Sequence, residues 1–231
     1  MTEGWDATMP TNKSADKNKS RNFGLKYLPI DLARIVCSCL IPVFRMKRVT
    51  PDGEKYTHKI KGGAIAAANH TSFGDPFMVG IAFWYRRMFF LAAEAVMKNK
   101  LIYFLLRGAG CIKVERSIAD IEAIKKCVGV LKKGHLLGVF PQGGIDNEEN
   151  LDKLKSGAIL MSLQADVPIF PMYLCPRQHW YTRRTVVIGE TIYPNRICTK
   201  KMPSTKDITE ITDLLKAEMN RCKMYNSEET K

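Results

Sequence analysis

Between residues 64 and 222, short apolar runs alternate with longer segments in which apolar side chains recur at helical spacing. Short apolar runs are typical of buried strands, and a spacing of three to four residues is typical of helices. We expect strands at 64–68, 88–92, 111–114, 136–140, 167–174 and 185–188, and helices at 76–85, 97–106, 117–132, 155–164 and 205–222. This alternation predicts an α/β fold with a mainly parallel central sheet flanked by helices.

The segment before the alternating pattern divides into two parts. Residues 1–22 are polar and rich in Lys, Asn and Ser, which predicts a disordered tail. Residues 23–48 are predicted to form an amphipathic helix with basic flanks, either packed on the domain or lying in a membrane interface. Only 35–44 is free of charge, too short to span a bilayer, which takes about 20 residues. The folded domain is expected at 49–225.

Charge limits the partners of this chain. Lys and Arg number 36 against 23 Asp and Glu, a formal net charge of +13, which favours polyanionic partners. The basic residues are spread along the chain without a nucleic-acid-binding motif, so we expect anionic membrane lipids rather than nucleic acid. Seven cysteines without a C-x-x-C pair indicate free thiols in a reducing compartment, here the cytoplasmic face of a membrane.

A histidine and an aspartate five residues apart follow the first buried run. His70 lies in the loop after 64–68, and Asp75 precedes Pro76 at a typical helix start. A loop that curls into a helix can bring the two side chains together, and a carboxylate on one imidazole nitrogen leaves the other nitrogen to accept a proton. The alternative is a loop histidine beside a capping aspartate. The other histidines lie among basic or turn residues, so we propose no metal site.

Three further segments could bind an anion or line an apolar channel. Lys113 and Arg116 follow a Gly-led strand, and a guanidinium suits phosphate. Gln142, Gly143 and Gly144 form a turn after another strand, where glycine lets the backbone approach a ligand. The prolines of 167–172 favour an edge or irregular strand. Taken singly, these segments are explained equally well as a solvated arginine, a plain turn and a core strand.

Together and in this order, the four segments resemble the glycerol-phosphate and lysophosphatidic acid acyltransferase family. That family shows N-H-x-x-x-x-D, a Gly-led segment ending in Arg, F-P-E-G-T-R, and V-P-I-x-P. The corresponding segments here are 69–75, 110–116, 140–145 and 167–171, and 154–158 also looks like the family's K-x-G-A helix start. The resemblance covers roughly residues 60–175, most of the folded domain, which is then the acyltransferase domain.

The resemblance implies that His70 and Asp75 deprotonate an acceptor hydroxyl, which attacks the thioester of acyl-CoA or of an acyl carrier protein. No other cofactor is implied. Lys113, Arg116 and the turn Gln142–Gly143–Gly144 would bind the acceptor, a lysophosphatidic acid-like glycerolipid of phospholipid synthesis.

The third motif departs from the family pattern, because Gln142, Gly144 and Ile145 replace its Glu, Thr and Arg. Loss of the arginine removes a phosphate ligand, for which Lys113, Lys153 or Lys155 could substitute. Two alternatives therefore stay open: another lysolipid acceptor, or a lipid or acyl-carrier binding protein without catalysis.

Overall fold

The computed structural model describes residues 28–32, 35, 46–114, 121–145, 151, 154–176, 184–199 and 203–229. The predicted tail at 1–22 and most of the predicted helix at 23–48 lie outside the described residues.

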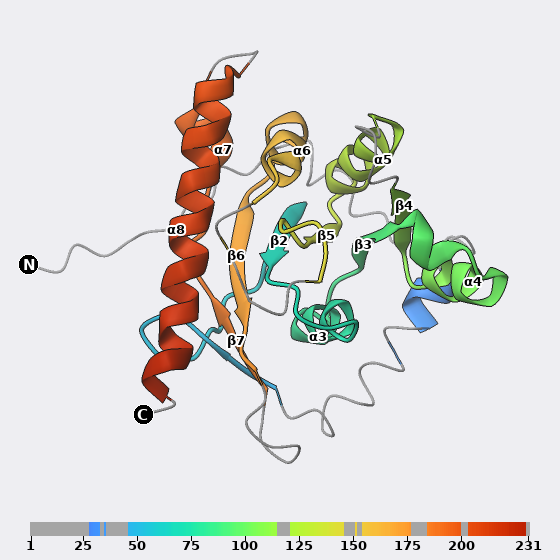
Figure 1. The fold of residues 1–231 in the computed structure, drawn as a ribbon, viewed down its shortest axis with the longest axis horizontal. Helices are drawn as coiled ribbons and strands as arrows, with labels where there is room; N and C mark the ends of the chain where they lie inside the picture. Colours follow the sequence, from blue (N-terminus) through green and yellow to red (C-terminus); the bar gives the residue numbers. More distant parts are fainter. Residues whose placement is uncertain are drawn as a thin grey trace, which may run out of the picture.

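A single seven-stranded sheet forms the centre of the fold, in the order β1-β7-β6-β2-β5-β3-β4 (Figure 1). Its strands are β1 (Lys47–Val49), β2 (Ala64–Ala68), β3 (Met88–Ala93), β4 (Cys111–Val114), β5 (Leu136–Val139), β6 (Ile169–Leu174) and β7 (Thr185–Ile188). The five strands from β6 to β4 run parallel, which confirms the mainly parallel sheet. β7 runs antiparallel to β6, and β1 pairs in parallel with β7.

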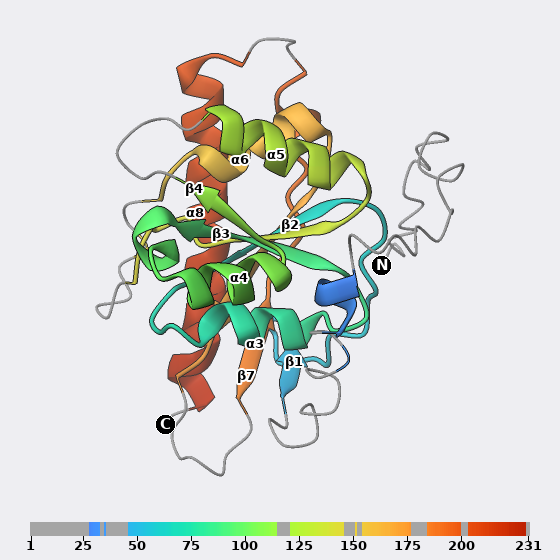
Figure 2. The same ribbon diagram turned by 90° about the vertical axis from the view of Figure 1, so that its right-hand side faces the viewer.

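Helices cover both faces of this sheet (Figure 2). They are α3 (Asp75–Ala82), the 3₁₀ helix η2 (Glu94–Met97), α4 (Lys100–Gly108), α5 (Ile121–Lys132), α6 (Gly157–Ala165), α7 (Pro194–Ile197) and α8 (Thr205–Glu229). α3 and α4 lie on one face and α5 and α6 on the other, and α8 packs over β6 and β7 on the same face as α5 and α6 (Figures 1 and 2). This arrangement follows from right-handed crossovers between parallel strands.

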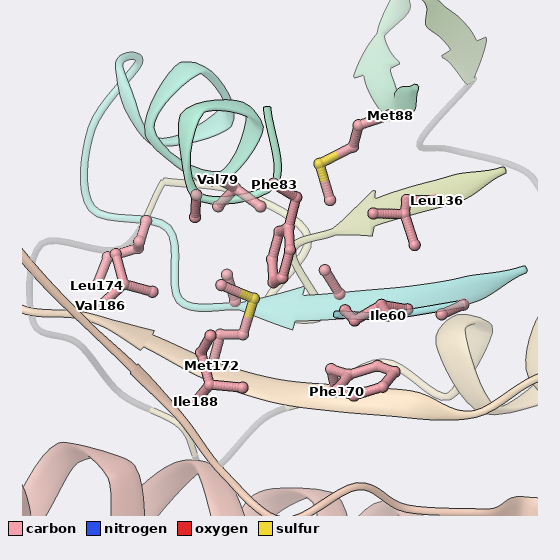
Figure 3. Close-up of a cluster of buried hydrophobic side chains, with 14 of the residues drawn as sticks. Ile60, Val79, Phe83, Met88, Leu136, Phe170, Met172, Leu174, Val186 and Ile188 are labelled. Atoms are coloured by element: carbon pink, nitrogen blue, oxygen red, sulfur yellow. The ribbon is translucent and has the colours of Figure 1, made fainter. Parts of the chain in front are cut away.

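The central strand β2 is built almost wholly of alanine, and all five of its residues are buried. Ala66 and Ala68 face α3, whereas Ile65 and Ala67 face α5 and α6, as expected where successive side chains alternate between sheet faces. The small side chains leave room for larger neighbours. Figure 3 shows Phe83, from the end of α3, pointing into the apolar layer on the sheet.

The proline-containing segment, for which an edge, an irregular and a core strand were all open, forms the interior strand β6 between β2 and β7. Pro171 is tolerated there for a local reason. Its carbonyl accepts a hydrogen bond from Gly189, which already lies past the end of β7. The missing N–H of the proline therefore falls where the ladder with β7 is ending, and little pairing is lost.

Two helices differ from their expected bounds. The helix expected at 97–106 begins at Lys100, because Glu94–Met97 first forms the 3₁₀ helix η2. The terminal helix continues to Glu229, well beyond 222. Its Leu215, Met219 and Cys222 are fully buried. Packing against the sheet therefore stabilises this mostly polar helix beyond the point where apolar residues recur at helical spacing.

The described part of the N-terminal segment is helical at 28–32 and 35. Ile30 is buried, and Asp31 forms a bidentate pair with Arg87, so this piece is attached to the domain. Lys47 and Arg48, expected at the end of the N-terminal helix, instead lie in β1 and pair with β7. Among the described residues, no helix has the length and apolar character needed to cross a membrane.

Candidate active site

The candidate site lies at the centre of the sheet, where the loops that follow two neighbouring strands separate. The neighbouring strands β2 and β5 are followed by α3 and α6, which lie on opposite faces. Loops that leave adjacent strands toward opposite faces separate and open a site at the carboxyl ends of the strands. The loop at 69–74 and the turn at 140–144 both begin at this point.

These two loops are held together by His70. Its backbone N–H donates to the Gln142 side-chain oxygen at 2.8 Å, and its ring stacks on Phe140 with centroids 4.2 Å apart. Gln142 is thus brought next to His70, as the motif order suggested. A glutamate carboxylate would accept the same bond, so the Gln142 replacement retains this contact between the loops.

A neighbouring asparagine anchors the loop on its other side. The Asn69 side chain accepts from the Leu174 N–H at 2.7 Å and donates to the Leu174 carbonyl at 3.3 Å. Asn69 is fully buried. This pair of bonds extends the β2–β6 ladder by one position, and it fixes the point at which His70 leaves the sheet.

His70 and Asp75 face each other across the loop, with 3.2 Å between Nδ1 and Oδ2. The same Oδ2 accepts the backbone N–H groups of Thr71 and Ser72, each at 2.7 Å. Gly74 is the helix N-cap, so Asp75 is the first residue of α3 and its side chain turns back into the loop. Because a carboxylate only accepts, Nδ1 carries the proton and Nε2 is left as the basic nitrogen.

The Asp75 carboxylate is fully buried and hydrogen-bonded through both oxygens. Its Oδ1 accepts from Ser72 Oγ at 2.8 Å and from Arg184 Nη2 at 2.9 Å. Burial alone would raise the pKa of Asp75, but hydrogen bonds from the His70 ring and from Ser72 and the loop backbone outweigh it. The pKa of Asp75 is therefore held well below its ordinary value, and the group is an anion at neutral pH.

Arg184 is a site residue that the sequence pattern did not single out. It immediately precedes β7, and because β7 is antiparallel, the start of this strand lies at the edge where the parallel strands end. The direction of β7 is not encoded in its four-residue apolar run. An arginine before a short apolar run carries no signal of its own.

The turn after β5 approaches a lysine closely. Gly143 has φ +77°, and a Cβ at this position would lie 2.6 Å from Lys155 Nζ. The Lys155 N–H also donates to the Pro141 carbonyl at 2.8 Å. Glycine at 143 therefore permits the left-handed backbone of the turn, and its lack of a side chain leaves room for Lys155. Of the three lysines considered for the lost arginine, Lys155 lies at the turn, and Lys153 lies outside the described residues.

The second motif lies farther out. Lys113 is on the edge strand β4, two strands from β5, and its ammonium pairs with Glu94 Oε1 at 2.5 Å. Arg116 lies outside the described residues. Gly144 follows Gly143 in the turn, and Ile145, where the family has arginine, is 39% exposed. The structure thus brings His70, Asp75, Gln142 and Gly143 together, with Lys113 apart from them.

The sequence profile described as Acyltransferase matches residues 48–175, which contain every part of this site except Arg184. The chain belongs to this acyltransferase family. Among curated proteins, it is similar to the 1-acyl-sn-glycerol-3-phosphate acyltransferase of Bacillus subtilis, with 26% identity over 109 residues, 47% of this chain and 54% of the relative. It is also similar to the enzyme of the same name from Cocos nucifera, with 30% identity over 134 residues, 54% of this chain and 41% of the relative.

The chain spans about half the length of these curated acyltransferases. Among solved structures, it is similar to the 1-acyl-sn-glycerophosphate (LPA) acyltransferase PlsC from Thermotoga maritima. The TM-score is 0.55 at 18% identity, and the match covers 84% of this chain and 79% of that one. This likeness supports the acyltransferase fold.

Proposed function

We propose that this chain is an O-acyltransferase that moves a fatty acyl group from a thioester donor, acyl-CoA or acyl carrier protein, to a hydroxyl of a lysophosphatidic acid-like glycerolipid. The observation that carries the proposal is the contact between His70 Nδ1 and the buried, ionised Asp75. The family match and the names of the similar acyltransferases support the same reaction.

In the proposed reaction His70 acts as a general base. Its Nε2 takes the proton of the acceptor hydroxyl while the oxygen attacks the thioester carbonyl carbon. The carbon–sulfur bond of the resulting tetrahedral intermediate then breaks, and the proton passes from His70 to the departing thiolate. Asp75 holds the ring orientation and stabilises the imidazolium that forms between the two steps.

We further propose that the acceptor phosphate binds at the turn after β5. The Gly144 amide and the exposed Lys155 ammonium suit a phosphomonoester, because a backbone N–H group and an ammonium are ordinary phosphate ligands. The Gly143 N–H already donates to the Phe140 carbonyl at 2.9 Å, so Gly143 contributes the shape of the turn. Gln142 supports the site through His70, since its side-chain oxygen binds the His70 amide. Lys113, on the edge strand β4, remains an outer candidate for a larger head group, and Arg116 remains a candidate phosphate ligand outside the described residues.

We propose that the acceptor reaches the site from a membrane. Large exposed apolar side chains belong to three described segments on the side of the sheet that α3 and α4 cover (Figure 2): the N-terminal helical piece, the His70 loop with α3, and α4. They include Leu28, Leu32, Ile35, Phe73, Leu101 and Phe104, and we call them the apolar face. Leu28, Leu32 and Ile35 follow helical spacing and point away from the buried Ile30.

Basic residues border the apolar face. Lys98, Lys100 and Arg107 are exposed at the ends of α4, which suits the anionic head groups of a bilayer. We propose peripheral binding at the cytoplasmic surface of a membrane, with Phe73 placing the loop of His70 at the lipid. The buried free thiols of Cys198 and Cys222 suit that reducing side.

Mass spectrometry of purified protein incubated with a lysolipid panel tests this function. Acyl-CoA and acyl carrier protein are supplied as donors in separate reactions. We expect a product from lysophosphatidic acid, heavier by one acyl group. Turnover only of lysolipids with a larger head group, which the exposed Ile145 in place of arginine would favour, would move the proposal to another acceptor. Absence of turnover across the panel would replace it with lipid binding alone.

A further inference from the structure

Arg184 reaches the site from outside the family's motifs. Its Nη2 lies 2.9 Å from Asp75 Oδ1, while the other oxygen of Asp75 faces the His70 ring. The arginine side chain is 16% exposed and the aspartate 0%. A guanidinium, a carboxylate and an imidazole therefore follow one another from the start of β7 to the loop after β2.

Folding alone explains this arginine poorly. The Thr71, Ser72 and His70 donors already satisfy Asp75, so the carboxylate does not need another partner to be buried. Arg184 also keeps a buried Nε that has no hydrogen-bond partner within the described part of the chain. A buried donor without a partner costs stability, and such costs are often retained at functional sites.

The charge of Arg184 opposes that of Asp75 at the imidazole. A carboxylate beside His70 favours the imidazolium, because it attracts the positive ring. A base must start a cycle without its proton, so an unopposed carboxylate would hold His70 in the inactive form over a wider pH range. A guanidinium on the far oxygen of the same carboxylate reduces this effect.

We propose that Arg184 is a positioning residue for the His70–Asp75 pair, which fixes the rotation of the Asp75 carboxylate and partly offsets its negative charge at the imidazole. The ion pair stands on its own geometry, and only its catalytic consequence rests on the proposed acyl transfer.

The electrostatic environment of the His70 ring depends on every charged group that lies around it. Asp75 faces the ring from α3, Arg184 lies behind Asp75 at the start of β7, and Lys155 lies at the turn after β5. Phe140 stacks on the ring from the end of β5 and adds no charge. Arg184 differs from Lys155 because it binds the carboxylate itself, so its removal leaves Asp75 Oδ1 with the bond from Ser72 Oγ and without the guanidinium.

The test is an NMR titration of His70 in the full chain, with the resonance assigned from a His70→Asn sample. Arg184→Gln removes the charge and keeps a hydrogen-bond donor. We expect the titration midpoint of His70 to rise by about one pH unit, the size expected for one nearby charge in a partly screened site. Arg184→Lys keeps the charge and should leave the midpoint near that of the wild type.

Arg87→Gln is the matched control. Arg87 also forms a partly buried pair with an aspartate, at 17% exposure, but it lies at the opposite end of the strands and near His135. This variant should move the titration of His135 and leave that of His70 unchanged. If each arginine variant moves only the titration of its neighbouring histidine, the effect is local charge and not a general loss of stability.

The kinetic prediction follows from the titration. In Arg184→Gln, the acid limb of kcat/KM should move to higher pH by the same amount as the NMR midpoint. An unmoved His70 midpoint in a folded Arg184→Gln protein would overturn the proposal. If that variant does not fold, an Arg184→Lys acid limb that differs from the wild type by about one unit would overturn it instead. A shifted midpoint without any acyl transfer would retain the ion-pair role and reject the proposed function.

Discussion

Asn69 and Leu174 join the His70 loop to the neighbouring strand through two buried hydrogen bonds between the Asn69 side chain and the Leu174 backbone. The residue before the candidate base therefore has a structural task. It continues the sheet for one more position, so that His70 begins its loop from a fixed point.

Replacement of Asn69 by Ala should lower the free energy of unfolding by about 3 kcal/mol, because the Leu174 N–H and carbonyl lose their buried partner. Chemical denaturation measures the change. Asn195→Ala is the control, since the Asn195 side chain also bonds to another residue, Asp166, but in an exposed position. An equal loss of unfolding free energy in the two variants would show that the buried pair of hydrogen bonds stabilises the protein no more than an exposed one.

Lys155→Gln should raise KM for a phosphate-bearing acceptor by about tenfold, the usual weight of one charge-assisted hydrogen bond. The kcat should change less, because His70 and Asp75 are untouched. Steady-state kinetics with an acceptor series measures the effect, and the exposed Lys125→Gln on α5 is the control. A KM that also rises for an acceptor without phosphate would speak against a phosphate contact.

Membrane binding should depend on the apolar face. Leu101→Asp together with Phe104→Asp should cut flotation with anionic vesicles by at least about tenfold, since two apolar side chains no longer enter the interface. Ile121→Asp is matched in exposure, at 63% against 67% for Leu101, but lies on α5 across the sheet. Loss of flotation in the control and not in the double variant would place the membrane contact on the other face.

His135 predicts a pH-dependent stability away from the site. Burial, aided by the charges of Arg87 and Arg86, lowers the pKa of His135 to about 4. Its unfolded pKa is about 6.5, so the unfolded state takes up the proton first as the pH falls. Stability should therefore be complete above about pH 6.5 and decline toward pH 4 by about 2 kcal/mol, a value reduced for partial exposure.

Urea unfolding at several pH values between 4.5 and 7 measures this decline. His135→Gln should flatten the slope, because its side chain does not titrate. His58→Gln, at an exposed histidine, should keep the wild-type slope. A wild-type slope retained in His135→Gln would assign the pH dependence to other groups.

The sequence predicted most of the sheet because its strands are short, apolar and separated by helical segments. β2, β4 and β7 have the expected bounds, and the parallel order of the five central strands is confirmed. The position of β6 stayed open, because the prolines favour an edge or irregular strand and a core strand explained the segment equally well. The carbonyl of Pro171 pairs only where β7 has ended, which depends on strands distant in sequence.

The site shows the same division between local and long-range information. The proximity of His70 and Asp75 could be predicted because both lie on one loop that enters one helix. The presence of Arg184 at the site could not be predicted, because it depends on the antiparallel direction of β7. The contact of Lys155 with Gly143 depends on how the chain returns after residues 146–150, which no local pattern specifies.

The role of His70 as the general base is tested most directly by comparing acyl transfer by the purified wild type and His70→Asn. Thermal unfolding is measured on the same samples. His70→Asn keeps the backbone N–H that binds Gln142, so the loop should retain its fold. We expect the rate of acyl transfer to lysophosphatidic acid to fall by about 1,000-fold, the usual weight of a general base, with little change in Tm. Undiminished transfer by a folded His70→Asn protein would contradict the account.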